Sequence, residues 1–197
     1  RRIYDNPTSD WDGTWHLVAY SFSNGQERIR HRLRKELSWL GFGQLNNGTL
    51  ISPHDHISEV RELVAALGAT SSVDYFRADY KELYGANNLA MRCWSLDEIN
   101  DYYCEFIEKY RPMYQRDLLA VDSRPPAYCF ERRFWLTHQY RYFPFHDPYL
   151  PAQLLPDNWR GGEAVQLFRD YHSLLRNNAE AYVDQVLAGA PSKTGAI

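Results

Sequence analysis

The chain has 197 residues, with 22 Lys and Arg against 25 Asp and Glu and a formal net charge of −3. At about 150 residues per domain, this length accommodates one large domain or two small ones. The slightly acidic balance is not typical of a protein that coats nucleic acid. Aromatic residues make up 15% of the chain, and because so much aromatic surface has to be buried, the composition excludes a disordered chain.

The cysteines and the hydropathy pattern restrict the cellular context. Cys93, Cys104 and Cys129 are odd in number and irregularly spaced, so we interpret them as reduced thiols and predict neither a disulfide framework nor a CxxC zinc site. No apolar run reaches the ~18 residues that a membrane span requires, and no leader pattern opens the chain. We therefore expect a cytoplasmic protein with no membrane partner. Because the first residue is Arg1 and not Met, we interpret the chain as part of a longer protein.

Turn-forming residues between Asp5 and Gly13 predict that residues 1–14 form a linker. The pattern of apolar residues after it predicts alternating strands and helices. In chain order these are a strand over 15–22, a helix over 26–40, strands over 43–45 and 49–52, a helix over 57–67 and a strand over 73–78. The order β-α-β-β-α-β is typical of a ferredoxin-like fold, which we assign to residues 15–88.

The later part of the chain has a helical pattern, and we expect an all-helical C-terminal domain over 89–188 and a disordered tail over 189–197. The fold class is therefore α+β. A Ser-x-x-Glu capping box at Ser95 begins a helix that we expect to kink or end at Pro112. Further helices are predicted over 126–142 and 162–187, joined by an extended proline-rich segment.

The predicted helix over 26–40 carries a cluster of cations. Between Glu27 and Lys35 it has five Arg and Lys residues and one acid. Cations four residues apart repel one another on a helix, which favours an anionic partner such as nucleic acid. The alternative is a solvated helix face whose opposite side packs on the sheet. The residues that we assign to an anionic partner are Arg28, Arg32 and Lys35.

The remaining polar patterns do not indicate catalysis. His54 and His56 flank Asp55, but no third and fourth ligand accompanies them, so we predict no metal site. A single histidine in an aromatic helix, such as His138, is more typical of a hydrogen-bonded core residue than of a catalyst. The chain has no glycine-rich phosphate loop, no GxSxG and no HExxH motif. We therefore predict no catalytic residues, no cofactor and no enzyme.

Several motifs together resemble a known family. Four of them are Trp11-Asp12-Gly13-x-Trp15, Leu40-Gly41-Phe42-Gly43-x-Leu45, Ile51-Ser52-Pro53 and Tyr110-Arg111-Pro112. The longest is His138-x-Tyr140-Arg141-x-Phe143-x-x-x-Asp147-Pro148-x-Leu150-Pro151-x-x-Leu154-Leu155-Pro156-x-x-Trp159-x-Gly161. From Arg1 to about Val186 the chain resembles the PaaX family, repressors of bacterial phenylacetic acid degradation operons.

The resemblance implies a winged helix-turn-helix before Arg1, a middle ferredoxin-like domain akin to the CRISPR-associated adaptation nucleases, and a helical C-terminal domain. It implies operator DNA as a partner of the missing domain, a homodimer, and release by phenylacetyl-coenzyme A or a related acyl-coenzyme A. Ser21 stands where the nucleases have a metal-binding Asp, and a serine hydroxyl is a poor Mg²⁺ ligand. The chain would then be an effector-sensing and dimerisation region. A metal-dependent nuclease or a dimerisation module without a ligand remain the alternatives.

An acyl-coenzyme A requires cations for its phosphates and an apolar pocket for its acyl group. Both types of residue occur on or beside the predicted helix over 126–142. The residues that we assign to effector binding are Arg132, Arg133, Trp135, His138, Tyr140, Arg141 and Trp159. Alternatively, each of these side chains only holds the helices and the proline-rich segment together.

Overall fold

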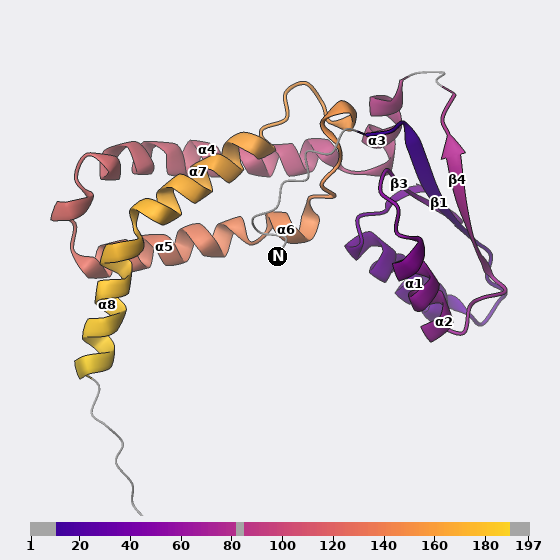
Figure 1. Cartoon of the computed structure of the whole chain (residues 1–197), viewed down its shortest axis with the longest axis horizontal. Helices are drawn as coiled ribbons and strands as arrows, with labels where there is room; N and C mark the ends of the chain where they lie inside the picture. The colour runs from indigo at the N-terminus through magenta and orange to yellow at the C-terminus, as the bar shows by residue number, and fades with distance from the viewer. Residues whose placement is uncertain (1–10, 82–84, 190–197) are drawn as a thin grey trace, which may run out of the picture. The chain divides into compact units, whose positions relative to one another are not determined.

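A computed structural model describes residues 11–81 and 85–189 (Figure 1). They form two compact units. The sheet unit takes in the described residues up to Ile99 together with Phe145–Trp159, and the helical unit takes in Asn100–Pro144 and the chain from Arg160 onward. Most of the predicted linker and the predicted tail, residues 1–10 and 190–197, lie outside the described residues.

The sheet unit confirms the predicted fold class. Its four strands form an antiparallel sheet in the order β2-β3-β1-β4. The strands are β1 (Thr14–Tyr20), β2 (Gly43–Asn46), β3 (Thr49–Ser52) and β4 (Val73–Asp79). Two helices, α1 (Glu27–Trp39) and α2 (Ile57–Ala66), complete the β-α-β-β-α-β order. Asn46-Asn47-Gly48 forms the turn between β2 and β3, where the Gly48 N–H donates to the Asn46 side-chain oxygen at 2.9 Å.

Alternation along β1 sends its side chains into two separate cores. Val18 and Tyr20 pack in one core with residues of α1 and α2, including the buried Leu33. Trp15 belongs to the other core, which α3 (Ala86–Cys93) and the 3₁₀ turn η2 (Ala152–Leu154) complete. Helix α3 was not predicted by the sequence pattern, and neither was the short helix α6 (Phe143–His146), which lies where an extended proline-rich segment was expected.

Gly43 marks a close contact in this second core. A Cβ atom at this position would lie 2.5 Å from the nearest ring carbon of Trp94. The indole N–H of Trp94 in turn donates to the carbonyl oxygen of Gly41 at 3.2 Å. A side chain at position 43 would therefore displace the indole, which accounts for glycine within a strand.

The helical unit is built from α4 (Leu96–Leu118), which begins in the sheet unit, and from the helices that follow it. These are η1 (Val121–Ser123), α5 (Pro126–Tyr140), α6 (Phe143–His146), α7 (Gly161–Leu174) and α8 (Arg176–Gly189). Of the two alternatives predicted at Pro112, a kink or an end, the end is wrong, because α4 continues to Leu118. Tyr110 and Asp117 are both buried on this helix, and their packing outweighs the about 3 kcal/mol that an internal proline costs.

The prediction of a single helix over 162–187 is also wrong, because this part of the chain forms two helices that separate at Leu175. Figure 1 shows α8 turning away from the direction of α7. Asn178 donates its side-chain N–H to the carbonyl oxygen of Val121 at 2.8 Å, and Tyr182 contacts Phe130 with ring centroids 5.2 Å apart. These contacts, which a local pattern does not encode, fix the direction of α8.

Aromatic rings form the core of the helical unit. Tyr140 of α5 stacks on Phe168 of α7 with ring centroids 3.8 Å apart and an interplanar angle of 10°. Tyr103 of α4 stacks in the same way on Phe143, at 4.0 Å. Phe106 contacts both Tyr140 and Phe143 edge to face. These contacts join α4, α5 and α7, and they leave the other faces of α5 to form cavities.

Candidate functional site

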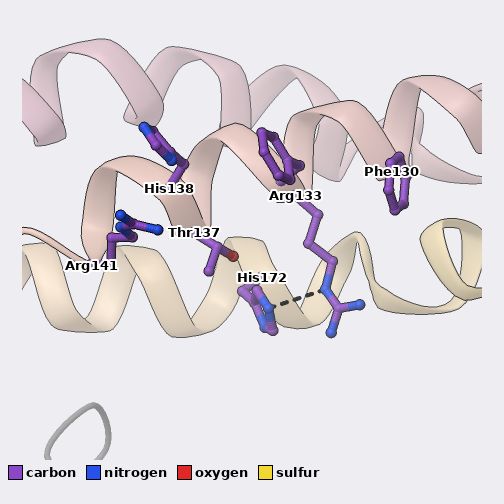
Figure 2. A pocket seen from close by; sticks show the side chains of 7 residues that line it. Phe130, Arg133, Thr137, His138, Arg141 and His172 are labelled. Carbon is purple, nitrogen blue, oxygen red and sulfur yellow. Dashed lines mark hydrogen bonds between the residues drawn. The ribbon is translucent and has the colours of Figure 1, made fainter.

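One face of α5 lines a cavity of about 420 Å³ (Figure 2). Its side chains recur three or four residues apart, which places them on one side of the helix. The lining residues are Phe130, Arg133, Phe134, Thr137, His138, Arg141 and, from α7, His172. This cavity, which is the smaller of two along α5, therefore combines two guanidinium groups, two imidazoles and two phenyl rings.

Arg133 lies between the helices that border the smaller cavity. Its Nε donates to Nε2 of His172 at 3.1 Å, as the dashed line in Figure 2 marks. Its Nη1 lies 3.8 Å from a carboxylate oxygen of Glu180 on α8. The pKa of His172 is lowered by burial and by the nearby charges of Arg133 and Arg176. The neutral imidazole is therefore the form that accepts the hydrogen bond from Arg133.

We expect the helical unit to lose stability as the pH falls below the ordinary histidine pKa of 6.5, since a lowered histidine pKa means that folding favours the neutral imidazole. The contribution of His172 is fully present above its ordinary pKa of 6.5 and is lost as the folded protein takes up a proton below it. Urea unfolding at a series of pH values measures this loss. His172→Gln keeps an acceptor without a titrating ring and should show a smaller decline. An equal decline in both proteins would contradict the assignment.

A second, larger cavity of about 600 Å³ lies between α4 and α5. Its lining residues are Tyr102, Glu105, Lys109, Tyr110, Arg132, Trp135, His138, Gln139, Tyr142 and Phe143. The Lys109 ammonium donates to the Gln139 side-chain oxygen at 2.8 Å, and the rings of Tyr102 and Tyr142 lie 4.6 Å apart. His138 lines both cavities. The two cavities therefore adjoin along α5.

Arg132 is one of the two cations that line the larger cavity, with Lys109. Its guanidinium carbon lies 5.2 Å from the ring centroid of Tyr128, in cation–π geometry. Its Nε is buried and has no hydrogen-bond partner among the described residues. A buried N–H without a partner is costly, so this group is suited to an acceptor supplied by a ligand.

The structure places five of the seven predicted effector residues at these cavities. Arg133 and Arg141 line the smaller cavity, Arg132 and Trp135 line the larger one, and His138 lines both. Tyr140 instead lies in the aromatic core, and Trp159 packs in the sheet unit against the cluster that contains Trp15. The sequence analysis missed the other lining residues, which include Phe130, Phe134, Lys109 and His172. Helical spacing identifies Phe130, three residues before Arg133, and Phe134, four residues before His138, but no local signal identifies His172.

The other candidates from the sequence are the His54–His56 segment, Ser21 and the cations of α1. Across residues 11–81 and 85–189, no group of three or more His, Cys, Asp and Glu side chains is arranged to hold a metal. Nε2 of His54 lies 3.1 Å from the carbonyl oxygen of Tyr149, and Asp55 accepts hydrogen bonds from Tyr75 and the backbone of Ile57. Ser21 follows the end of β1 and is exposed. Arg28, Arg32 and Lys35 lie on the exposed side of α1.

The described helices include none that is both long enough and apolar enough to cross a membrane. The described residues define an α+β chain with a ferredoxin-like sheet unit and a helical unit, and comparison with known families identifies its family. Residues 8–90 match the family model described as the PaaX protein central Cas2-like domain. Residues 94–185 match the PaaX-like protein C-terminal domain. The chain belongs to the PaaX family.

Known proteins agree with this assignment. The chain is 31% identical over 188 residues to the transcriptional repressor PaaX of Escherichia coli (strain K12). The match covers 93% of this chain and 58% of that repressor, so the chain spans less than two thirds of the relative's length. A solved structure, the uncharacterized protein Rv0674 from Mycobacterium tuberculosis, superposes with a TM-score of 0.60 at 20% identity and covers 91% of this chain and 67% of the other. That likeness shows the fold alone.

Proposed function

We propose that this chain is the effector-sensing and dimerisation region of a transcriptional repressor of phenylacetate catabolism, and not an enzyme. Membership of the PaaX family and the similarity to a transcriptional repressor support the regulatory role. Operator DNA would be bound through an N-terminal winged helix-turn-helix outside these residues. The observation that carries the sensing role is the pair of adjoining cavities along α5, which combine cations with aromatic walls.

A phenylacetyl-coenzyme A molecule has the two-part chemistry that these cavities fit. Its phosphates are suited to the guanidinium groups of Arg133 and Arg141 in the smaller cavity, because arginine binds phosphate through paired N–H donors. Its phenyl ring is suited to the larger cavity, where Trp135 and Tyr142 provide aromatic walls. His138 lines both cavities and would contact the part of the ligand that passes between them.

Phosphate binding would change the contacts of Arg133. In the structure this guanidinium is shared between His172 of α7 and Glu180 of α8. A phosphate competes with Glu180 for the same positive charge, so the bound state would weaken the link between α5 and α8. A ligand regulates a repressor only if it binds the DNA-incompetent arrangement more tightly. The exchange of Glu180 for a phosphate at Arg133 would be a local source of that difference in affinity.

Isothermal titration of the 197-residue chain with phenylacetyl-coenzyme A tests the sensing role. We expect micromolar binding of the thioester and much weaker binding of phenylacetate or coenzyme A alone. Hydrogen bonds to charged groups contribute about 1.5–3 kcal/mol each, so Arg133→Gln/Arg141→Gln should weaken binding at least ~tenfold. Arg116→Gln, which removes an exposed cation of α4, is a control for the loss of a positive charge outside the cavities. Binding that is unchanged in the double variant would contradict the site.

Dimerisation is tested separately by sedimentation velocity of the same chain over a range of concentrations. A dimer whose stability responds to the thioester would support a sensing and dimerisation region. A monomer at every concentration, with or without thioester, would contradict the dimerisation part of the proposal and leave the titration result unaffected.

A further inference from the structure

Helix α1 presents a continuous row of cations to solvent. Its buried side consists of Ile29, Leu33 and Leu37, which pack in the core of the sheet unit. At 100° per residue, the opposite side carries residues spaced by three or four positions. These are Arg28, His31, Arg32, Lys35 and Trp39, and all five are exposed. We call them the α1 row.

The charge of this helix opposes that of the chain. Between Glu27 and Trp39 there are five Arg and Lys residues and two Glu residues, a net charge of +3, whereas the whole chain has a net charge of −3. Neither acid belongs to the α1 row. Glu27 begins the helix and accepts a hydrogen bond from the N–H of Gly25. The row therefore contains no carboxylate.

Several arginines elsewhere in the described chain have carboxylate partners. Arg77 pairs with Asp12, Arg124 with Asp117, and Arg111 and Arg160 with Glu163. In contrast, no described carboxylate lies within ion-pair distance of Arg28 or Arg32, and the contact of Lys35 is the ring of Trp39, at 5.5 Å. Two arginines four residues apart without acids repel each other. An external polyanion would relieve this repulsion.

We propose that the α1 row binds the sugar–phosphate backbone of duplex DNA without reading its sequence. The rise from Arg28 to Lys35 is about 10 Å, which equals the axial length of about three phosphates of one DNA strand. Trp39, 60% exposed at the end of the row, offers a flat apolar surface to a deoxyribose. Phosphate contacts of this kind position a protein on DNA and add affinity. The inference goes beyond the proposed function, because it places a DNA contact within this chain.

The test is fluorescence anisotropy of a labelled duplex of arbitrary sequence, titrated with the 197-residue chain at salt concentrations from about 50 to 200 mM. We expect weak binding whose affinity falls steeply with salt. The variant Arg28→Gln/Arg32→Gln/Lys35→Gln should lower the affinity at least ~tenfold and reduce the salt slope by about 2–3, since each phosphate contact contributes about 1. Arg28→Lys/Arg32→Lys, which keeps the charges, should retain the slope.

A matched control removes the same charges elsewhere. Lys81→Gln/Arg92→Gln/Arg116→Gln also replaces two arginines and one lysine, all exposed and outside α1. This control variant should bind DNA with the same affinity as the unchanged chain. Both triple variants should have equal thermal stability. Absence of DNA binding at the lowest salt, or an equal loss in the control, would overturn the proposal. Displacement of the duplex by polyglutamate as readily as by unlabelled DNA would also overturn it, in favour of an acidic protein partner.

Discussion

Asp117→Ala should destabilise the helical unit by about 3–5 kcal/mol, the range found when one partner of a buried ion pair is removed. The side chain of Asp117 is completely buried, with 0% exposure. It accepts hydrogen bonds from Arg124 at 3.1 Å and from the hydroxyls of Tyr128 and Tyr171 at 2.9 Å and 2.6 Å. Its loss would leave three donors from three segments of the chain without their acceptor.

Urea unfolding followed by circular dichroism measures this effect. Asp122→Ala, which removes an exposed carboxylate only a few residues away, should change the free energy of unfolding by no more than about 0.5 kcal/mol. Tyr171→Phe removes one hydrogen bond to a charged group and should cost about 1.5–3 kcal/mol. The pKa of Tyr171 is raised by burial and by Asp117, so its hydroxyl remains a donor at alkaline pH. A loss below about 1 kcal/mol for Asp117→Ala would contradict the importance of this network.

Tyr140→Ala should cost about 3–5 kcal/mol of stability, as for other large aromatic core residues. Tyr140 is only 4% exposed and stacks on Phe168, so its replacement leaves a cavity between α5 and α7. Trp135 lies five residues earlier on the same helix but is 50% exposed and lines the larger cavity. Trp135→Ala should therefore change stability by less than about 1 kcal/mol.

The same two variants separate structure from binding. If Trp135 contacts the acyl group, Trp135→Ala should weaken binding of phenylacetyl-coenzyme A at unchanged stability, since a buried aromatic contact contributes about 1.5–3 kcal/mol. Tyr140→Ala should lose binding of the thioester only under conditions in which the helical unit also unfolds. Thermal unfolding and titration of both variants give the comparison. A stable Tyr140→Ala protein that fails to bind the thioester would reverse the two roles.

The sheet unit was predictable from sequence because its apolar residues follow local periods. Leu33 and Leu37 recur at helical spacing, and Val18 and Tyr20 alternate along a strand, so each pattern depends only on neighbouring residues. Helix α3 spans only Ala86–Cys93, which is too short for its helical pair, Leu89 and Cys93, to identify it. Its buried residues Leu89 and Cys93 pack with Leu150 and Leu154 from far along the chain, and that partnership is not visible in any short window.

The candidate site was predictable only as far as one helix face. Arg133 and Arg141 share a helix, and helical geometry brings them near one cavity. His172 comes from a different helix, and its position depends on the packing of Tyr140 on Phe168. Trp159 is near α5 in sequence but belongs to the sheet unit. Proximity to α5 along the chain therefore did not show that Trp159 belongs to the sheet unit.

The return of residues 145–159 to the sheet unit has a consequence for synthesis on the ribosome. Domains generally fold as units, with the N-terminal domain first. Here Leu150 and Leu154 complete the core around Trp15, so this core remains open while residues 100–144 of the helical unit are being made. The first unit in the chain therefore cannot be finished until part of the second unit has been made. In a nascent chain that pauses before Leu150, the indole of Trp15 would be exposed on the side that Leu150 and Leu154 later cover.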